Sequence, residues 1–475
     1  MREEKSVDLQ FPVVHLRPAR NWVNDPNGLV YHDGQYHVFF QYNPESARHG
    51  NVHWGHFVSE DLCRWDLLPE ALAPSVSGPD RDGVWSGNAI SHGGGLVAFF
   101  SAKDDGRFDQ PVAIARSRDG VTFVKDEQLA VPAAPAGTSM FRDPFVWWDG
   151  TRWRMLVGAS LDDGQGAALQ FVATDRNRLV DWRYEGVFFS HAPQALPGGQ
   201  DTGSGWECVQ IIPLTDELDA VLTSAWEPVD GAKCAVGWVG TTRDGAFYAG
   251  SVQRLDYGPD FYAPAIMRTP AGRTLLWGWI WEARDERIVG APSSWIDEVG
   301  WAGMLSLPRE LFAREDGRIG QRPAVELEDL RGRPLLNHVG SSPVPLGMLE
   351  RACELRLRLE GDAGLRVTTS LDGREYLEIR RVAESGDVVV DRDHSSLDDR
   401  AKRGSWNLPC DGDHADLRVV IDHSVVEVFT AAGDALTCRF YPVSPDPWRA
   451  FTTGMGRHLV AAWALHPLQI IVPRW

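Results

Sequence analysis

Three carboxylates stand in unusual local sequences in the first half of the chain. Asp25 lies among Asn, Pro and Gly residues, a composition that predicts a tight turn with its side chain pointing outward. Asp143 follows Arg142, whose positive charge favours the ionised carboxylate. Glu207 lies between Trp206 and a cysteine, and this apolar setting favours its protonated form. One protonated and one ionised carboxyl group in a single pocket are what cleavage of a glycosidic bond requires.

Each carboxylate also has an ordinary structural interpretation. Asp25 would then be a solvated side chain on a hairpin turn, and Asp143 half of an Arg–Asp pair at a strand start. Glu207 would lie on an edge strand and face water. The choice depends on whether the fold brings the three together.

The intervening sequence predicts strands. Asp-Gly pairs recur along the chain, for example at Asp33 and Asp149, and runs such as 36–40 and 153–157 between them are rich in Val, Tyr, Phe and Trp. Turn pairs flanked by β-forming residues are typical of hairpins. Because helical periodicity of useful length is absent, we predict an all-β protein.

A faint repeat predicts how these strands are grouped. Ser or Thr shortly before an Asp, followed by Trp or Phe, begins at Ser59, Ser117 and Thr174, with a looser copy at Thr242. The first three copies begin 58 and 57 residues apart. A β-rich unit that recurs at this spacing is typical of a propeller blade, in which four strands stand beside a central channel. About five such blades fit before residue 320.

The predicted propeller brings the carboxylates together. Asp25, Asp143 and Glu207 would fall near the starts of the first, third and fourth blades. Because the innermost strands of a propeller begin around its channel, these side chains would converge there.

The sequence changes character near residue 320. Residues 321–330 suit a short helix, 331–347 are rich in Gly, Pro and Ser, and strict alternation of apolar and polar residues follows at 355–359, 417–422 and 425–429. This alternation predicts an antiparallel β-sandwich with a mainly structural role. We expect a five-bladed β-propeller in 1–325, a linker in 326–345 and the sandwich in 346–475.

Composition excludes some partners. The formal net charge is −19, from 47 Lys and Arg against 66 Asp and Glu, which argues against nucleic acid and anionic membranes. The start of the sequence lacks the apolar core of a signal peptide, so we expect a cytoplasmic location.

Six scattered cysteines without a Cys-x-x-Cys pair favour free thiols. His53 and His56 have no third ligand motif, so we expect no metal, and the 20 Trp residues hint at sugar binding.

Residues from about 18 to 321 resemble the catalytic propeller of glycoside hydrolase family 32, the β-fructofuranosidases. Eight stretches carry this resemblance in order: Asn24-Asp25-Pro26-Asn27-Gly28, Gln41-Tyr42-Asn43-Pro44, His53-Trp54-Gly55-His56, Trp85-Ser86-Gly87, Phe141-Arg142-Asp143-Pro144, Trp206-Glu207-Cys208, Asp260-Phe261-Tyr262-Ala263-Pro264 and Leu305-Ser306-Leu307-Pro308-Arg309-Glu310-Leu311. The segment 422–429 resembles the C-terminal sandwich of the same family.

The resemblance implies a retaining mechanism. Asp25 would be the nucleophile, Glu207 the acid and then the base, and Asp143 the stabiliser of the transition state. The residues expected to bind substrate are Trp22, Asn24, Gln41, His49, Trp54, Trp85, Ser86, Arg142, Asp256, Tyr262 and Trp279. No cofactor or metal is expected, and the only partner implied is a small sugar, without an oligomeric state.

The implied reaction releases terminal β-D-fructofuranosyl residues from sucrose and short fructooligosaccharides by exo-action. A fructosyltransferase with the same covalent intermediate and a sugar-binding propeller without catalysis are the alternatives. Three positions depart from the family pattern: His49 and Asn88 stand where Trp and Ser are common, and Val209 where Pro is common. His49 borders the mouth of the pocket, so this departure bears on the leaving group.

Overall fold

Strands dominate both domains of the computed structural model, which describes residues 8–105, 109–284 and 294–473. The described helices are α1 (Ser294–Val299) and the short 3-10 helix η1 (Val325–Leu330). In this part of the chain, no helical segment combines the length and apolar character needed to traverse a bilayer. The described structure confirms the all-β prediction.

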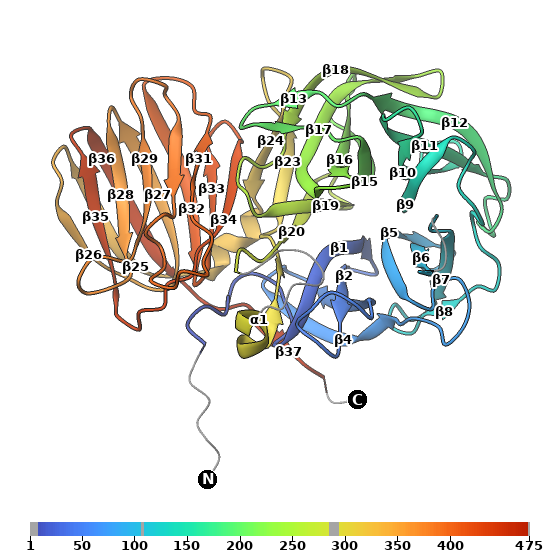
Figure 1. The fold of residues 1–475 in the computed structure, drawn as a ribbon, viewed down its shortest axis with the longest axis horizontal. Coiled ribbons are helices and arrows are strands. Elements are labelled where there is room, and N and C mark those ends of the chain that lie inside the picture. The colour runs from blue at the N-terminus through green and yellow to red at the C-terminus, as the bar shows by residue number, and fades with distance from the viewer. Residues whose placement is uncertain (1–7, 106–108, 285–293, 474–475) are drawn as a thin grey trace, which may run out of the picture.

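Five antiparallel sheets form the N-terminal domain (Figure 1). The first contains β1 (Asn21–His32), β2 (Gln35–Asn43), β3 (His53–Ser59) and β4 (Arg64–Leu72). The second contains β5 (Gly83–His92), β6 (Gly95–Lys103), β7 (Val112–Ser117) and β8 (Val124–Lys125). The third contains β9 (Thr138–Trp148), β10 (Trp153–Leu161), β11 (Gly166–Ala173) and β12 (Trp182–His191).

The fourth sheet contains β15 (Gly205–Pro213), β16 (Asp219–Glu227), β17 (Gly231–Arg243) and β18 (Ala246–Arg254). The fifth contains β19 (Phe261–Arg268), β20 (Thr274–Ile280), β22 (Met304–Leu305), β23 (Arg309–Ala313) and β24 (Ile319–Pro323). A small hairpin, β13 (Ala195–Leu196) with β14 (Gln200–Asp201), precedes the fourth sheet, and β21 (Trp301–Ala302) pairs in parallel with β1.

The first strands of the sheets close a ring. β1 contacts β5, β5 contacts β9, β9 contacts β15, β15 contacts β19, and β19 returns to β1. Apolar faces of neighbouring sheets pack against each other all round the ring, and the closure between the fifth and first sheets buries Trp277 with Phe40. This is the predicted five-bladed propeller, and its ring places the starts of five strands around one axis.

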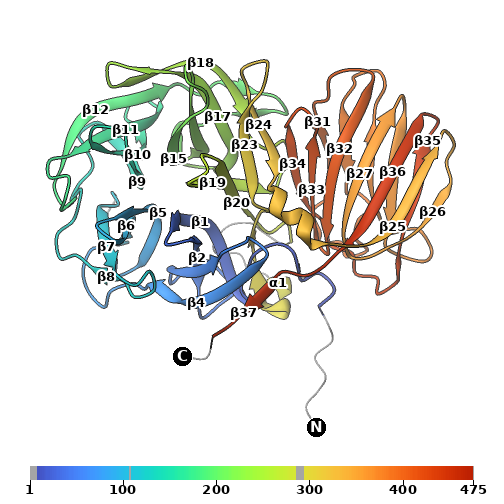
Figure 2. The same ribbon diagram turned by 180° about the vertical axis from the view of Figure 1, so that it is seen from behind.

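The C-terminal domain is a sandwich of two six-stranded sheets, seen beside the propeller from both sides in Figures 1 and 2. One sheet runs β25 (Arg331–Gly340), β36 (Arg457–Leu465), β27 (Ala352–Glu360), β32 (His414–Asp422), β33 (Val425–Thr430) and β34 (Ala435–Arg439). The other runs β26 (Pro345–Leu349), β35 (Trp448–Gly454), β28 (Ala363–Thr368), β29 (Tyr376–Arg381), β30 (Val388–Asp391) and β31 (Ser405–Leu408). One continuous apolar core lies between them.

The expected linker at 326–345 is structured. It holds most of η1 and all of β25, which pairs with β36 in the sandwich. Gly and Pro suggested a loop there, but pairing with β36 outweighs that local tendency. We therefore place the domain boundary between residues 324 and 330. The chain then returns to the propeller at its end, where β37 (Gln469–Ile471) pairs in parallel with β4.

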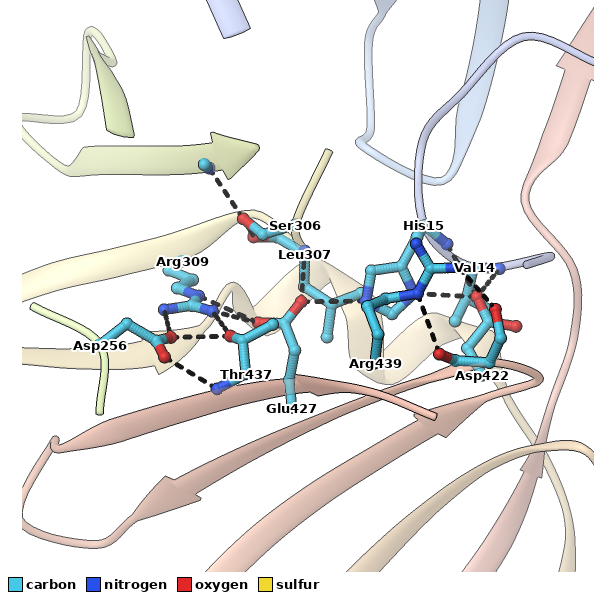
Figure 3. Close-up of polar contacts among 12 residues, drawn as sticks. Val14, His15, Asp256, Ser306, Leu307, Arg309, Asp422, Glu427, Thr437 and Arg439 are labelled. Carbon is cyan, nitrogen blue, oxygen red and sulfur yellow. Dashed lines mark hydrogen bonds and ion pairs between the residues drawn. The ribbon is translucent and has the colours of Figure 1, made fainter. Parts of the chain in front are cut away.

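A buried ionic network joins the two domains (Figure 3). His15, from the segment before β1, places Nδ1 2.8 Å from Asp422 Oδ2 and Nε2 2.9 Å from Glu427 Oε1. Arg309 of β23 donates to Glu427 Oε2 at 2.6 Å and to Asp256 Oδ2 at 2.9 Å. Side chains of these groups are fully buried, so each charge depends on its partner.

This network predicts a pH-dependent stability. Burial lowers the pKa of His15, but the hydrogen bonds and charges of Asp422 and Glu427 outweigh it and raise the pKa to about 8. The stabilisation is therefore full below the unfolded-state pKa of about 6.5 and is lost as the pH rises through 8. We expect the free energy of unfolding in urea to fall by about 2 kcal/mol across this window.

The variant His15→Gln is expected to lose this slope, because glutamine does not titrate. His414→Gln removes an exposed histidine of the sandwich and should keep the wild-type slope. A stability of the wild type that stays flat from pH 6.5 to 9 would contradict the assignment of the slope to His15.

Candidate active site

Each inner strand of the propeller is irregular where it reaches the axis. Its pairing register shifts at the following places: between Val23 and Pro26 in β1, Val84 and Gly87 in β5, Arg142 and Phe145 in β9, Glu207 and Gln210 in β15, and Tyr262 and Ala265 in β19. Such bulges interrupt the alternation of side chains and re-aim them. The ring of bulges therefore turns five short segments toward one space.

The segment around Asp25 is one of these bulges and not a hairpin turn. Residues 22–28 lie within β1, and the reversal of the chain occurs after His32. The prediction of a tight turn was wrong because Pro and Gly also mark bulges, where a missing N–H or a positive φ is tolerated. Gly28 has a φ of 52°.

Backbone strain accompanies the bulges. Asp143, Cys208 and Ala263 have φ values of 65°, 49° and 46°, in the left-handed region that residues with a Cβ rarely adopt. Each lies in the irregular part of an inner strand. Such conformations persist where the surrounding structure enforces them, and they cluster at functional sites.

Asp25 is held by a chain of donors. The Ser86 hydroxyl donates to Asp25 Oδ2 at 2.5 Å, and the Gln41 amide donates to the Ser86 hydroxyl. Cys208 Sγ lies 3.8 Å from the same Oδ2 atom. These contacts fix the orientation of the carboxylate, and among the described residues no hydrogen bond occupies its other oxygen, Oδ1.

Asp143 lies beside Asp25. Its Oδ2 atom accepts the Cys208 backbone N–H at 3.1 Å and is 3.8 Å from Cys208 Sγ, so one thiol contacts both aspartates. The Asp143 N–H donates to Ser101 Oγ at 2.7 Å, which links β9 to β6. Sequence reasoning gave Cys208 no role, although its place directly after Glu207 was a signal.

Glu207 is bound at both oxygens. Arg142 donates to Oε1 from Nε at 2.9 Å and Nη2 at 2.8 Å. The Tyr262 hydroxyl is 2.6 Å from Oε2 and 3.0 Å from the carbonyl oxygen of Ala225. Burial and the charge of Glu207 raise the pKa of Tyr262 well above its usual value, so this hydroxyl keeps its proton.

The Tyr262 hydroxyl can serve either protonation state of Glu207. When Glu207 is ionised, Tyr262 donates its proton to Oε2. When Glu207 is protonated, its O–H donates to the tyrosine oxygen, and Tyr262 turns its own proton to the Ala225 carbonyl. A hydroxyl has one donor and two acceptor sites, so both arrangements are satisfied.

The cluster retains protons at near-neutral pH. Burial raises the pKa of Asp25 well above its usual range, and the charges of Asp143 and Glu207 add to this against the Ser86 hydrogen bond. Burial and the charge of Glu207 raise the pKa of Asp143 to about 6, against the opposing charge of Arg142. The two aspartates of the cluster thus hold protons to a higher pH than free carboxyl groups do, as is typical of catalytic sites.

Aromatic side chains form the walls of the site. His49 lies in edge contact with Trp22 and Trp85, with ring centroids 4.9 Å and 5.8 Å apart. Trp279 belongs to the apolar cluster of Cys208 and Tyr262 and packs edge-on against Trp281 at 5.5 Å. The Trp279 indole nitrogen and Asn24 Oδ1 are buried and have no hydrogen-bond partner among the described residues. A bound polyol would supply partners for such groups.

Two expected substrate-binding residues lie outside this space. Asp256 is buried at the domain interface, where its carboxylate accepts Arg309, the Thr437 hydroxyl and two backbone N–H groups. Trp54 is fully buried and donates to the Trp85 carbonyl at 3.0 Å, so it supports the wall from behind. The resemblance implied that both residues bind substrate, but contacts formed by distant segments determine where their side chains lie.

The departures at Asn88 and Val209 have structural roles. Asn88 exchanges two hydrogen bonds of 2.9 Å with the backbone of Val146 and so ties β5 to β9. Val209 is buried in the core between the third and fourth sheets. His53 Nδ1 donates to Glu70 Oε2, 2.8 Å away, while His56 is buried against Phe39. Among the described residues no group of three potential ligands could hold a metal ion.

Comparison with known proteins places this site in a family. The model described as glycosyl hydrolases family 32 N-terminal domain matches residues 15–323, and the one described as glycosyl hydrolases family 32 C terminal matches 326–460. The chain belongs to glycosyl hydrolase family 32. It is therefore a glycoside hydrolase of the β-fructofuranosidase kind.

Relatives of this family 32 protein match over nearly their whole length. A raffinose invertase of Escherichia coli is 33% identical over 458 residues, which cover 91% of this chain and 90% of the relative. A sucrose-6-phosphate hydrolase of Escherichia coli is 32% identical over 466 residues, covering 91% and 89%. The structure of a Bombyx mori β-fructofuranosidase is 25% identical, with a TM-score of 0.80 and coverage of 98% and 95%.

Proposed function

We propose that the protein is a retaining, exo-acting β-fructosidase that removes terminal non-reducing β-D-fructofuranosyl residues from sucrose and short fructooligosaccharides. The observation that carries the proposal is the linked cluster of Asp25, Asp143 and Glu207. Cys208 connects the two aspartates, and Arg142 and Tyr262 hold Glu207 beside them.

In the first step, Asp25 attacks the anomeric carbon C2 of the fructosyl unit. The bond from C2 to the bridging oxygen breaks, and Glu207 gives its proton to that oxygen as the leaving sugar departs. The product of this step is a fructosyl ester of Asp25. In the second step, water attacks C2, Glu207 takes a proton from the water, and the ester bond to Asp25 breaks.

The protein environment supports this division of roles. The reactive state requires a proton on Glu207 and charge on Asp25. In that state the Tyr262 oxygen accepts a hydrogen bond from the Glu207 O–H, and the Tyr262 hydroxyl donates to the Ala225 carbonyl. Hydrogen bonds from the fructosyl hydroxyl groups to the aspartates would favour their charged forms and lower the raised pKa of Asp25.

Exo-action is supported by the shape of the channel. A small cavity on the axis is lined by Asp143 and Cys208 together with inner-strand residues such as Asn27, Asn88 and Gln210. The end of a sugar chain can therefore enter the site, but the chain cannot pass along the propeller axis. A cytoplasmic location, expected from the sequence, would suit small substrates.

Small β-fructosides are supported as substrates by the names of similar proteins. The relatives include a raffinose invertase and sucrose-6-phosphate hydrolases. A variant of the Bombyx mori enzyme was solved in complex with sucrose, and a chicory fructan 1-exohydrolase IIa variant in complex with 1-kestose.

A panel of sucrose, sucrose 6-phosphate, 1-kestose, inulin and levan tests the proposal. We expect fructose release from sucrose and 1-kestose to exceed that from the polymers. Proton NMR should detect β-fructofuranose as the first product, before mutarotation, because two inversions retain configuration. Release of the α-anomer first would refute retention, and fructosylated sucrose as the main product at high sucrose would favour the transferase.

A further inference from the structure

His49 occupies a fixed position against two aromatic side chains of the site, Trp22 and Trp85. Its ring stands nearly perpendicular to both Trp22 and Trp85, at interplanar angles of 86° and 90°. Arg48, its neighbour, forms a two-point ion pair with Asp297 of α1, at 3.0 Å and 2.6 Å. The loop is also held by a hydrogen bond of 2.9 Å from the Trp22 N–H to Ser46 O. The imidazole is therefore positioned before any ligand arrives.

Within the described part of the chain, the polar atoms of the His49 ring have no hydrogen-bond partner. Among the described residues, neither ring nitrogen of His49 makes a hydrogen bond, and neither is enclosed. Burial lowers the pKa of His49, while the charge of Asp105 opposes this effect. The ring is thus uncharged at neutral pH and offers one donor and one acceptor, as a sugar hydroxyl does.

The position of His49 relative to the reacting groups indicates which part of the substrate it meets. Trp85 directly precedes Ser86, the donor to Asp25, and Trp22 lies three residues before Asp25 on β1. The fructosyl unit must lie over Asp25, inside these two indoles. Arg142, which binds the proton donor Glu207, lies 5.9 Å from the ring centroid of Trp85. His49 therefore packs against a wall that adjoins the acid facing the leaving group.

We propose that His49 is a specificity residue that hydrogen-bonds a hydroxyl group of the leaving sugar. This inference rests on the proposed function and adds the contact that reads the leaving group. His49 then acts only in the first step, since the leaving sugar has departed before water attacks C2.

Two substrates with the same fructosyl unit separate this role from a structural one. Sucrose leaves glucose, whereas β-D-fructofuranosyl fluoride leaves a fluoride ion that cannot bridge to His49. In His49→Phe the ring between the two indoles is kept and the nitrogens are lost. We expect the ratio of kcat/KM for sucrose to kcat/KM for the fluoride to fall about three- to tenfold, the range of an uncharged hydrogen bond.

The control variant is His53→Phe, which removes a histidine paired with Glu70 outside the site and should leave this ratio at its wild-type value. A ratio in His49→Phe equal to that of the wild type would overturn the inference, even if both rates fell together. Failure of the wild type to release fructose from either substrate would instead refute the proposed function.

Discussion

The variant Asp25→Asn is expected to lose sucrose hydrolysis while gaining stability. An amide has the shape of the carboxylate and still accepts the Ser86 hydroxyl, but it cannot attack C2. We expect kcat to fall by at least roughly 10⁴-fold, as for loss of other catalytic nucleophiles. The loss is measured as fructose release from sucrose over hours, and mass spectrometry checks the purity of the variant protein.

The stability of this variant follows from the pKa of the residue it replaces. The folded-state pKa of Asp25 is raised, so ionisation of Asp25 destabilises the fold at any pH above its unfolded-state value. An uncharged Asn removes that cost, and thermal unfolding at pH 8 should occur at the same or a higher temperature than in the wild type.

Asp256→Asn is the matched control, because Asp256 is an equally buried carboxylate outside the site. Arg309 binds both Asp256 and Glu427, so Asp256→Asn removes one of the two buried carboxylates that compensate this guanidinium, and it should lower the unfolding temperature while fructose release by the folded fraction continues. Substantial sucrose turnover by Asp25→Asn would contradict the role of Asp25 as nucleophile.

The sequence predicted the architecture because blades and sandwich strands are local patterns. Asp-Gly turns and alternating runs such as 417–422 describe elements whose partners are mostly adjacent in the chain. The three carboxylates were also predictable, since each lies in a short motif at the start of a blade. Their convergence followed from the propeller symmetry and needed no knowledge of individual contacts.

Other features depend on contacts between distant segments and could not be read from local sequence. The motif around Asp25 predicted a turn, but pairing of β1 with β2 turns it into a bulge. Asp256 looked like a pocket residue, and only packing of the sandwich draws it to Thr437, 181 residues away. The His15 network likewise joins residues more than 400 positions apart. No periodicity or motif records such pairs.

The variant Glu207→Gln is expected to make turnover depend on the leaving group. Gln cannot protonate the bridging oxygen of sucrose, so kcat/KM for sucrose should fall roughly 10²- to 10⁴-fold. β-D-fructofuranosyl fluoride needs much less proton donation at its leaving group and should still form the fructosyl ester readily. The amide can accept from Arg142 and donate to the Tyr262 oxygen, so the site keeps its geometry.

The second step supplies an independent test of the same residue. In Glu207→Ala supplied with β-D-fructofuranosyl fluoride, the ester on Asp25 can form but no base activates water, so the ester should accumulate and be visible as a mass increase of the protein. Azide is a charged nucleophile that needs no base, and it also fits the space left by the side chain. Attack by azide on C2 displaces the Asp25 carboxylate and yields β-D-fructofuranosyl azide. An α-configured azide, or no rescue of the ester that has accumulated, would show that Glu207 is not the base of a retaining mechanism.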